Sequence, residues 1–238
     1  MKIALLGYGK MGKTIEQIAL QRNHEISYRI DVQNISDLQL LSKKNTDVAI
    51  EFTSPHSAYA NVRFCVDQQI PVVCGTTGWL DKKTEIEQAC LKQKSAFFYA
   101  SNYSIGVNIF FQINEILAKM MNNYPDFDVQ MEEIHHTQKL DKPSGTAVTL
   151  AEGIMKNIFR KTEWALSPVI DSKQLEINAL REENVFGIHS VNYTSAIDTI
   201  EIKHTAHSRQ GFATGAVLAA EFLAGKTGIF GMNDLLAL

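Results

Sequence analysis

The sequence predicts an α/β protein in which a doubly wound parallel sheet is joined to a second, α+β domain with a mixed, partly open sheet. Short apolar runs alternate with segments of helical period over the first part of the chain. A glycine-rich loop stands between the first apolar run and the first helical segment. After residue 102 the predicted strands follow one another with few helices between them. We therefore predict one domain of residues 1–103 and 208–238, and a second of residues 104–207.

Apolar runs rich in β-forming residues build the predicted parallel sheet. They are Lys2–Leu6, Glu25–Ile30, Val48–Phe52, Pro71–Cys74 and Ala96–Tyr99. Residues with helical spacing lie between them, in segments such as Met11–Gln21 and Ala58–Gln69. This alternation is typical of a parallel sheet that is covered by helices on both faces.

The second part of the chain has a different order of predicted helices and strands. A long apolar helix is predicted for Gly106–Met121. The predicted strands that follow it are Phe127–Ile134, Leu175–Ala179, His189–Thr194 and Thr199–His204. Apolar and polar residues alternate in the first two, which indicates one buried face and one face available to a subunit interface. An alanine-rich helix at Phe212–Phe222 is predicted to return to the first domain.

The composition disfavours several classes of protein. With a net charge of −3, the chain lacks the excess of basic residues that nucleic-acid binding requires, so we expect no nucleic-acid partner. No apolar run is long enough to span a bilayer, and the first strand follows Met1 directly, so we expect no membrane segment, no signal peptide and a cytoplasmic location. Cys65, Cys74 and Cys90 have neither metal nor disulfide spacing and are predicted to be reduced. A small-molecule partner is the remaining expectation.

The loop Gly7-Tyr8-Gly9-Lys10-Met11-Gly12 follows the first strand and opens the first helix. Glycines permit a tight turn and close backbone approach, while a helix start offers N–H groups and a positive dipole end to a pyrophosphate. Asp31 ends the second strand, where an acidic side chain meets ribose hydroxyls. A second loop, Gly75-Thr76-Thr77-Gly78, follows the fourth strand. Glycines alone also make plain turns, but this context predicts a Rossmann-type dinucleotide-binding domain.

The choice between NADH and NADPH stays open at this level. Asp31 would repel a 2′-phosphate, and Val32 supplies no basic group beside it. Lys10, Lys13 and Arg29 are cations that would attract one. We therefore predict NADH or NADPH as the cofactor.

Residues 132–147 leave a predicted strand, cross a polar loop and enter a predicted helix. Apolar residues recur at helical spacing over residues 147–158, and Ser144 has the side chain of a helix cap. Gly145 and Thr146 would then present backbone N–H groups at a helix start. Such a place favours a carboxylate, because the dipole and the donors act together.

Two adjacent histidines, His135 and His136, precede Lys139 in this segment. Neighbouring strand residues point to opposite faces, so the two histidines are expected to have different roles. One is a candidate proton donor, because an imidazole titrates near neutrality and a nearby lysine would tune its pKa. His136, Lys139 and the Thr146 hydroxyl would add charge and hydrogen bonds around an anion. We predict no metal site, because adjacent side chains diverge; two surface histidines are the ordinary alternative.

This segment resembles the signature of the 4-hydroxy-tetrahydrodipicolinate reductase family, also called dihydrodipicolinate reductases. The resemblance rests on the run Glu133-Ile134-His135-His136-Thr137-Gln138-Lys139-Leu140-Asp141-Lys142-Pro143-Ser144-Gly145-Thr146-Ala147 and extends over nearly the whole chain. Supporting matches are the loop Gly7–Gly12, Phe52-Thr53, Gly75-Thr76-Thr77, Ala100-Ser101-Asn102-Tyr103-Ser104-Ile105-Gly106, His204-Thr205-Ala206-His207-Ser208-Arg209 and Phe212-Ala213. Two stretches depart from the usual pattern of the family. The region between Arg160 and Gln174 is shorter than is usual, and Arg181-Glu182-Glu183-Asn184 stands where glycines often follow the arginine.

The resemblance implies an oxidoreductase of the diaminopimelate route to lysine, which reduces 4-hydroxy-tetrahydrodipicolinate to tetrahydrodipicolinate with NADH or NADPH. It implies that His135 is the proton donor and that Lys139 is its catalytic partner. The residues implied to hold the dicarboxylate substrate are His136, Ser144, Gly145 and Thr146. Those implied to line the nicotinamide side of the cofactor site are Gly75, Thr76, Thr77, Ala100, Ser101, Asn102 and Tyr103, with Arg209 and Phe212 at its border.

The resemblance also implies a homotetramer assembled through the sheets of the second domain, which would be the substrate-binding and oligomerisation domain. Two other classes are weighed against this assignment. A homoserine or aspartate dehydrogenase would not be expected to carry the His-His to Ser-Gly-Thr run. A nucleotide-binding sensor without turnover would be favoured if His135 or Lys139 were missing, and both are present.

Overall fold

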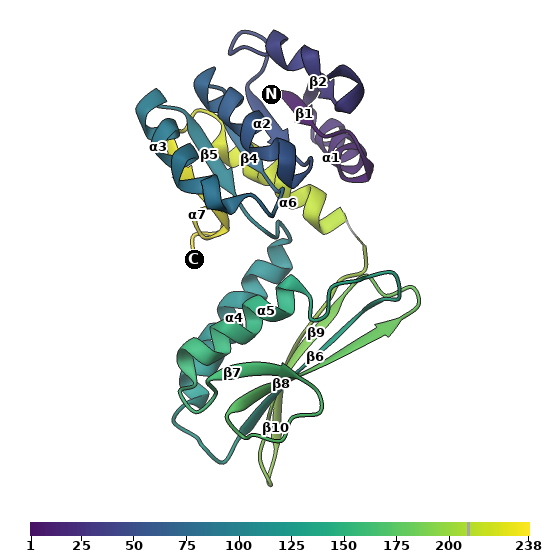
Figure 1. The fold of residues 1–238 in the computed structure, drawn as a ribbon, viewed down its shortest axis with the longest axis vertical. Helices are drawn as coiled ribbons and strands as arrows, with labels where there is room; N and C mark the ends of the chain where they lie inside the picture. Colours follow the sequence, from purple (N-terminus) through teal and green to yellow (C-terminus); the bar gives the residue numbers. More distant parts are fainter. Residues whose placement is uncertain (209) are drawn as a thin grey trace. The chain divides into compact units, whose positions relative to one another are not determined.

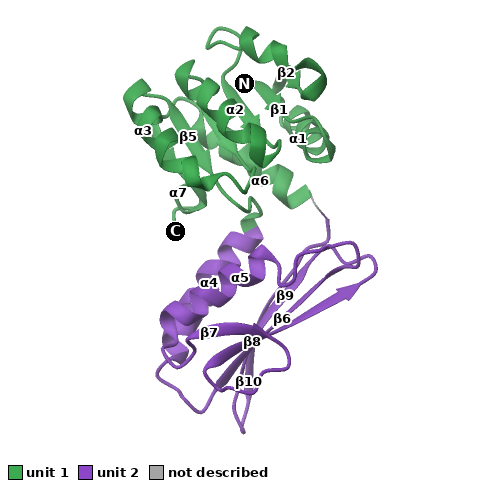
Figure 2. Ribbon diagram, viewed as in Figure 1, with its two compact units in different colours: residues 1–105, 210–238 green, residues 106–209 purple. Residues whose placement is uncertain are grey.

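The chain folds into two compact units (Figure 2). The computed structural model describes residues 1–208 and 210–238. One unit comprises Met1–Ile105 together with Gln210–Leu238, and the other comprises Gly106–Arg209. No helix in the described part of the chain is long and apolar enough to cross a membrane.

A six-stranded sheet forms the middle of the first unit (Figure 1). Its neighbouring strands are all parallel, in the order β11-β5-β4-β3-β1-β2. The strands are β1 (Lys2–Leu6), β2 (Glu25–Ile30), β3 (Val48–Glu51), β4 (Val72–Cys74), β5 (Ala96–Tyr99) and β11 (Gly228–Phe230). The strand order reverses beside β1, which confirms the predicted doubly wound sheet.

Both faces of this sheet are buried. Ile3 and Leu5 of β1 pack in a core with α1 and α6, whereas Ala4 and Leu6 pack in a second core with α2 and α3. The helical elements of the unit are α1 (Lys10–Gln21), η1 (Val32–Leu40), α2 (Pro55–Asp67), η2 (Leu80–Lys82), α3 (Lys83–Gln93), α6 (Gln210–Leu223) and α7 (Met232–Leu236). Burial on both faces explains why the strands are near-continuous apolar runs.

A mixed five-stranded sheet forms the second unit, in the order β10-β9-β6-β8-β7. The central strand β6 pairs antiparallel with β9 and parallel with β8. The strands are β6 (Asp128–His136), β7 (Glu163–Leu166), β8 (Gln174–Glu182), β9 (Ile188–Thr194) and β10 (Thr199–Thr205), and the helices are α4 (Ile105–Met121) and α5 (Gly145–Asn157). The core of this unit joins residues of these two helices to one face of the sheet, which confirms the predicted α+β unit.

Strand β6 carries the histidines. It runs two residues beyond the predicted end at Ile134, because His135 and His136 continue the ladder with Arg181 and Glu182 of β8. Alternate residues of β6 are buried on the face that carries the core, and the last of these is His135. The strand therefore delivers a titratable side chain to the edge of an apolar core.

Candidate active site

The loops that follow β1, β2 and β3 line a pocket of about 400 Å³ in the first unit. Gly7, Tyr8, Gly9 and Asp31 contribute to its lining. The Gly7 N–H donates to Ile30 O at 2.8 Å, which ties the glycine loop to the end of β2. Gly9 is the N-cap of α1, and no other described residue beyond its chain neighbours lies within 4 Å of the position that a Cβ would occupy on it. The start of this helix therefore fits the pyrophosphate of a dinucleotide. The first turn of α1 contains the remaining residues of the predicted glycine loop, Lys10, Met11 and Gly12.

Asp31 follows β2, at the predicted ribose position. Its carboxylate accepts the N–H of Val32 at 2.8 Å, and Val32 is 87 % exposed. Arg29 is not a free cation, because its Nε donates to Glu16 Oε1 at 2.8 Å. The hydrogen bonds from Arg29 lower the pKa of Glu16, so the ion pair persists at neutral pH. The Tyr8 hydroxyl donates to the same carboxylate.

Hydrogen bonds join the loops after β3, β4 and β5. Thr76 Oγ1 accepts the N–H of Thr53 at 2.8 Å, and the Tyr103 hydroxyl donates to Cys74 O at 2.7 Å. Ligands of open α/β sheets bind beyond the carboxyl ends of the strands, where these loops lie. The predicted nicotinamide-side residues follow those ends: Gly75, Thr76 and Thr77 after β4, and Ala100, Ser101, Asn102 and Tyr103 after β5.

The three cysteines, Cys65, Cys74 and Cys90, are free, as predicted, and the structure shows that they are also buried. Burial raises the pKa of each thiol, to about 11 for Cys90 and further for the other two. A thiolate is the reactive form, so these side chains are inert near neutral pH.

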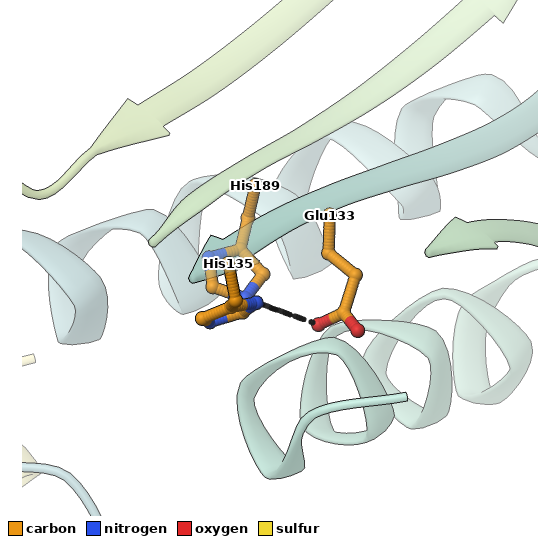
Figure 3. A group of neighbouring side chains, drawn as sticks. All are labelled: Glu133, His135 and His189. Atoms are coloured by element: carbon orange, nitrogen blue, oxygen red, sulfur yellow. Dashed lines mark ion pairs between the residues drawn. The ribbon is translucent and has the colours of Figure 1, made fainter. Parts of the chain in front are cut away.

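In the second unit, Glu133, His135 and His189 form a buried cluster (Figure 3). Glu133 Oε2 lies 3.4 Å from His135 Nδ1 and 3.7 Å from His189 Nε2. The two imidazole rings meet edge to face, with their centroids 5.0 Å apart. On its other side the carboxylate faces Arg181, whose Nη2 lies 3.4 Å from Oε1. Glu133 is fully buried, so this guanidinium supplies the countercharge that a buried carboxylate needs.

The start of α5 is tied to the same carboxylate. Both carboxylate oxygens of Glu133 accept the N–H of Ser144 at 3.1 Å. Ser144 is the N-cap of α5, because its Oγ accepts the N–H of Ala147 at 3.2 Å. The same Oγ lies 3.1 Å from His189 Nε2. In the part of the chain that the structure describes, a Cβ on Gly145, the first residue of α5, would meet no atom within 4 Å beyond its chain neighbours and its own helix backbone, so the helix start has room for a carboxylate.

Lys139 lies in the loop between β6 and α5. Its Nζ pairs with Asp141 Oδ2 at 2.8 Å. Arg181 holds the loop through its backbone, donating Nε to Lys139 O at 3.3 Å and Nη2 to Asp141 O at 2.5 Å. Arg181 therefore links the Glu133 cluster to the segment that carries the lysine.

Burial separates the two histidines of the cluster from ordinary surface imidazoles. It lowers the pKa of His135, the negative charge of Glu133 raises it, and the positive charges of Lys139 and Arg181 lower it further. The pKa of His189 falls to about 3, mainly through burial. His189 is therefore neutral near pH 7, whereas the charge of His135 depends on its neighbours.

The structure separates His136 from this cluster. It lies on the opposite face of β6 and lines a cleft of about 380 Å³ with Glu183 and Phe186 among others. Ser144, Gly145 and His135 lie together around the start of α5, while His136 is directed elsewhere. His136, the histidine predicted to bind the substrate, therefore has different surroundings from His135, the predicted proton donor.

The ligand atoms of Glu133, His135 and His189 lie within 4.8 Å of one another, a spacing that a metal ion could bridge. The Glu133 carboxylate, however, already faces the Arg181 guanidinium and accepts the Ser144 N–H. A divalent cation would have to enter a buried space beside that guanidinium, which is electrostatically unfavourable. We interpret the cluster as a network of protein groups.

Sequence reasoning did not single out three residues of this network: Glu133, Arg181 and His189. Glu133 could have been found from the strand period, because it stands two residues before His135 and shares its face. Nothing in the sequence brings Arg181 and His189 to that place, since they come from β8 and β9. Arg209, which the sequence placed at the border of the cofactor site, lies outside the described residues.

The comparisons with known proteins cover both units. Residues 1–103 match the family described as dihydrodipicolinate reductase, N-terminus, and residues 106–236 match dihydrodipicolinate reductase, C-terminus. A relative from Christiangramia forsetii, a 4-hydroxy-tetrahydrodipicolinate reductase, is 52% identical and covers 100% of this chain and 98% of its own length. The reductase of the same name from Methanosarcina mazei is 34% identical, over 99% of this chain and 89% of its own length.

A solved structure shares the fold. The dipicolinate-bound dihydrodipicolinate reductase from Paenisporosarcina sp. TG-14 superposes with a TM-score of 0.79 and covers 98% of each chain. It is 21% identical in sequence, so the likeness concerns the fold alone.

Proposed function

The chain belongs to the dihydrodipicolinate reductase family, and on that premise we propose that it is a 4-hydroxy-tetrahydrodipicolinate reductase. It is an oxidoreductase that uses a reduced nicotinamide dinucleotide to convert 4-hydroxy-tetrahydrodipicolinate into tetrahydrodipicolinate, in the diaminopimelate route to lysine. One observation carries the proposal: β6 delivers the buried His135 to the start of α5, so that a proton donor stands beside an anion site.

We assign the first unit to the dinucleotide and the second to the substrate. When bound, the reduced nicotinamide would supply a hydride to the imine-conjugated carbon of the substrate ring, after water has been lost from the hydroxylated ring. Gly7, Gly9 and the first turn of α1 would hold the pyrophosphate, and the loops after β4 and β5 would border the nicotinamide. This division of labour leaves the proton chemistry to the second unit.

His135 donates the proton to the carbon next to the one that is reduced. The N–H groups at Gly145 and Thr146, together with Lys139, hold the substrate carboxylates. In the complex with substrate, the two negative charges of the substrate carboxylates beside His135 raise the pKa of this histidine. This effect opposes that of burial and keeps the protonated form of His135 available. His136 follows His135 at the end of β6, and we propose that it approaches the substrate from the cleft on the opposite face of the strand.

The test is a coupled assay. A synthase that forms the hydroxylated substrate from pyruvate and aspartate semialdehyde is combined with this protein and a reduced dinucleotide. We expect nicotinamide absorbance to fall only when all components are present. Absence of oxidation with both NADH and NADPH would exclude the assignment.

We propose that the protein prefers NADH. Arg29, a cation that the sequence offered for a 2′-phosphate, is bound to Glu16, and Asp31 and Val32 present a carboxylate and an apolar side chain. We expect kcat/KM to be at least about tenfold higher with NADH than with NADPH. Replacing Val32 with arginine should narrow this ratio, whereas Val32→Gln, which adds no charge, should not. Equal use of both dinucleotides by the unaltered protein would contradict this prediction.

We propose that the protein is a cytoplasmic homotetramer built through the open sheet face of the second unit. Ile134 and Leu180 are neighbours across β6 and β8 on the face opposite the core, and both are only partly buried in the single chain. Sedimentation equilibrium is expected to give four times the mass of the chain. Replacing Leu180 with glutamate should reduce that mass, because it places a charge in the interface. A monomeric unaltered protein would refute the proposal.

A further inference from the structure

Glu133 is a buried carboxylate to which the proposed reaction assigns no role. It contacts the proton donor His135, the helix cap Ser144 and the cation Arg181. We propose that Glu133 is a positioning residue, which holds His135 through Nδ1 so that Nε2 delivers the proton, and which fixes the start of α5 through Ser144. The proposal rests on the proposed function, because it concerns the donor of that reaction.

The two ring nitrogens of His135 have different surroundings. Nδ1 is buried and faces Glu133 Oε2 at 3.4 Å, and within the described residues it has no hydrogen-bond partner. On the other edge of the ring stands Gly187, on which a Cβ would lie 3.1 Å from Nε2. The absence of a side chain at Gly187 leaves that edge of the ring uncrowded. Nδ1 therefore faces a fixed carboxylate, and Nε2 is the nitrogen with space for a substrate atom.

The carboxylate has the charge that a protonated imidazole requires. When His135 carries its second proton, both ring nitrogens are donors, and Nδ1 needs an acceptor. Glu133 Oε2 is the carboxylate oxygen that faces Nδ1, and it is held in place by the N–H of Ser144. A carboxylate behind an imidazole orients the ring and stabilises its charged form. The acid form of the donor is therefore stabilised where the substrate would be bound.

The same carboxylate organises the anion site. Ser144 donates its N–H to both oxygens of Glu133 at 3.1 Å, and its Oγ caps α5 at Ala147. His189 approaches that Oγ at 3.1 Å and stays neutral, since its pKa is about 3. One side chain thus sets the distance between the proton donor and the helix start. Loss of its charge would disturb the donor more than the helix, because a neutral amide can still accept the Ser144 N–H.

The charged and titratable groups around His135 come from every element of the site. They are Glu133 on β6, Lys139 and Asp141 on the loop after β6, Arg181 on β8 and His189 on β9. Burial and two cations lower the pKa of His135, and the two carboxylates oppose them. Of the two carboxylates, Glu133 raises the pKa of His135 more than Asp141 does. Removing its charge should therefore lower the pKa of His135.

The test is Glu133→Gln, which keeps the side-chain shape and removes the charge. The His135 pKa, followed by NMR titration of the imidazole in the free protein, is expected to fall by about one unit. In the coupled assay, kcat near pH 7.5 should fall about 10- to 100-fold, with the substrate KM changed less than about threefold. A general acid acts below its pKa, so the alkaline limb of the kcat profile should move to lower pH, and acidification should restore part of the rate.

Glu132→Gln is the matched control. Glu132 is the adjacent residue of β6 on the opposite face, where it accepts Asn178 Nδ2 at 3.0 Å. The same charge is removed, but the His135 pKa and the pH profile should stay as in the unaltered protein. Glu133→Asp keeps the charge but shortens the side chain by one methylene, so its His135 pKa should lie between those of the unaltered protein and of Glu133→Gln. If the glutamine variant does not fold, a fall in the His135 pKa of Glu133→Asp below that of the unaltered protein tests the proposal.

An unchanged His135 pKa in Glu133→Gln would overturn the proposal. A uniform loss of rate at every pH, with a lowered melting temperature, would also overturn it, because it would indicate a structural role alone. The NMR titration does not depend on turnover. If the unaltered protein fails to oxidise a reduced dinucleotide, the proposed function fails, and the titration still decides whether Glu133 controls His135.

Discussion

Replacing His135 with glutamine is expected to lower kcat of the reduction by about 10²- to 10⁴-fold, which is the usual contribution of a general acid. Glutamine is close in length and polar but has no proton to donate near neutral pH. The dinucleotide affinity should stay nearly unchanged, because the predicted cofactor residues belong to the other unit. The coupled assay measures kcat, and fluorescence titration of the reduced dinucleotide measures its Kd.

His204→Gln provides a comparison within the same unit. His204 is a half-buried histidine of β10 whose ring lies 6.1 Å from that of Phe110, outside the Glu133 cluster. The His204→Gln variant should retain a kcat near that of the unaltered protein. If His135→Gln turned over nearly as fast as His204→Gln, His135 would not be the proton donor.

Replacing Gly7 with alanine should have the largest effect on the first unit. Gly7 has φ +94°, and a Cβ there would lie 2.0 Å from the backbone oxygen of Phe52. A side chain cannot be accommodated without moving the loop after β3, and the backbone conformation is itself unfavourable for alanine. We expect the free energy of unfolding to fall by about 2–4 kcal/mol and dinucleotide binding to be lost. Thermal and denaturant unfolding, with dinucleotide titration, measure both.

Gly9→Ala separates stability from binding in the same loop. A Cβ on Gly9 would have no described residue other than its chain neighbours within 4 Å, so the fold should tolerate alanine. The added methyl group should instead hinder the approach of the pyrophosphate and raise the dinucleotide Kd. Equal stability losses in both variants would show that the loop is sensitive to any side chain. Normal dinucleotide affinity in Gly9→Ala would contradict the placement of the pyrophosphate at α1.

Local sequence predicted the elements whose formation depends on their own residues. The predicted runs Lys2–Leu6, Glu25–Ile30 and Ala96–Tyr99 coincide with β1, β2 and β5. Such strands are recognised because burial on both faces requires continuous apolar side chains. Helix α1 begins at Lys10, one residue before the predicted start at Met11. Ser144 was also predictable as a cap, because capping uses a side chain and a backbone N–H three residues away.

The elements that were not predicted depend on distant partners. The strand β7 (Glu163–Leu166) pairs with β8, and the three-residue β11 (Gly228–Phe230) adds to the sheet beside β5. Neither has the length or the alternation that marks a strand from sequence. Similarly, β6 extends to His136 because β8 offers backbone partners there, not because of its own residues.

The sequence by itself determined the two-part fold class, the glycine loop and the strand that carries His135 beside a capped helix, because each follows from local spacing and residue type. Only the tertiary structure decided what surrounds the donor. The register of β6 sets Glu133 opposite His189 of β9 and His135 opposite Arg181 of β8. Pairing between strands is set by the whole sheet, so the carboxylate, the neutral imidazole and the guanidinium meet only after the chain has folded.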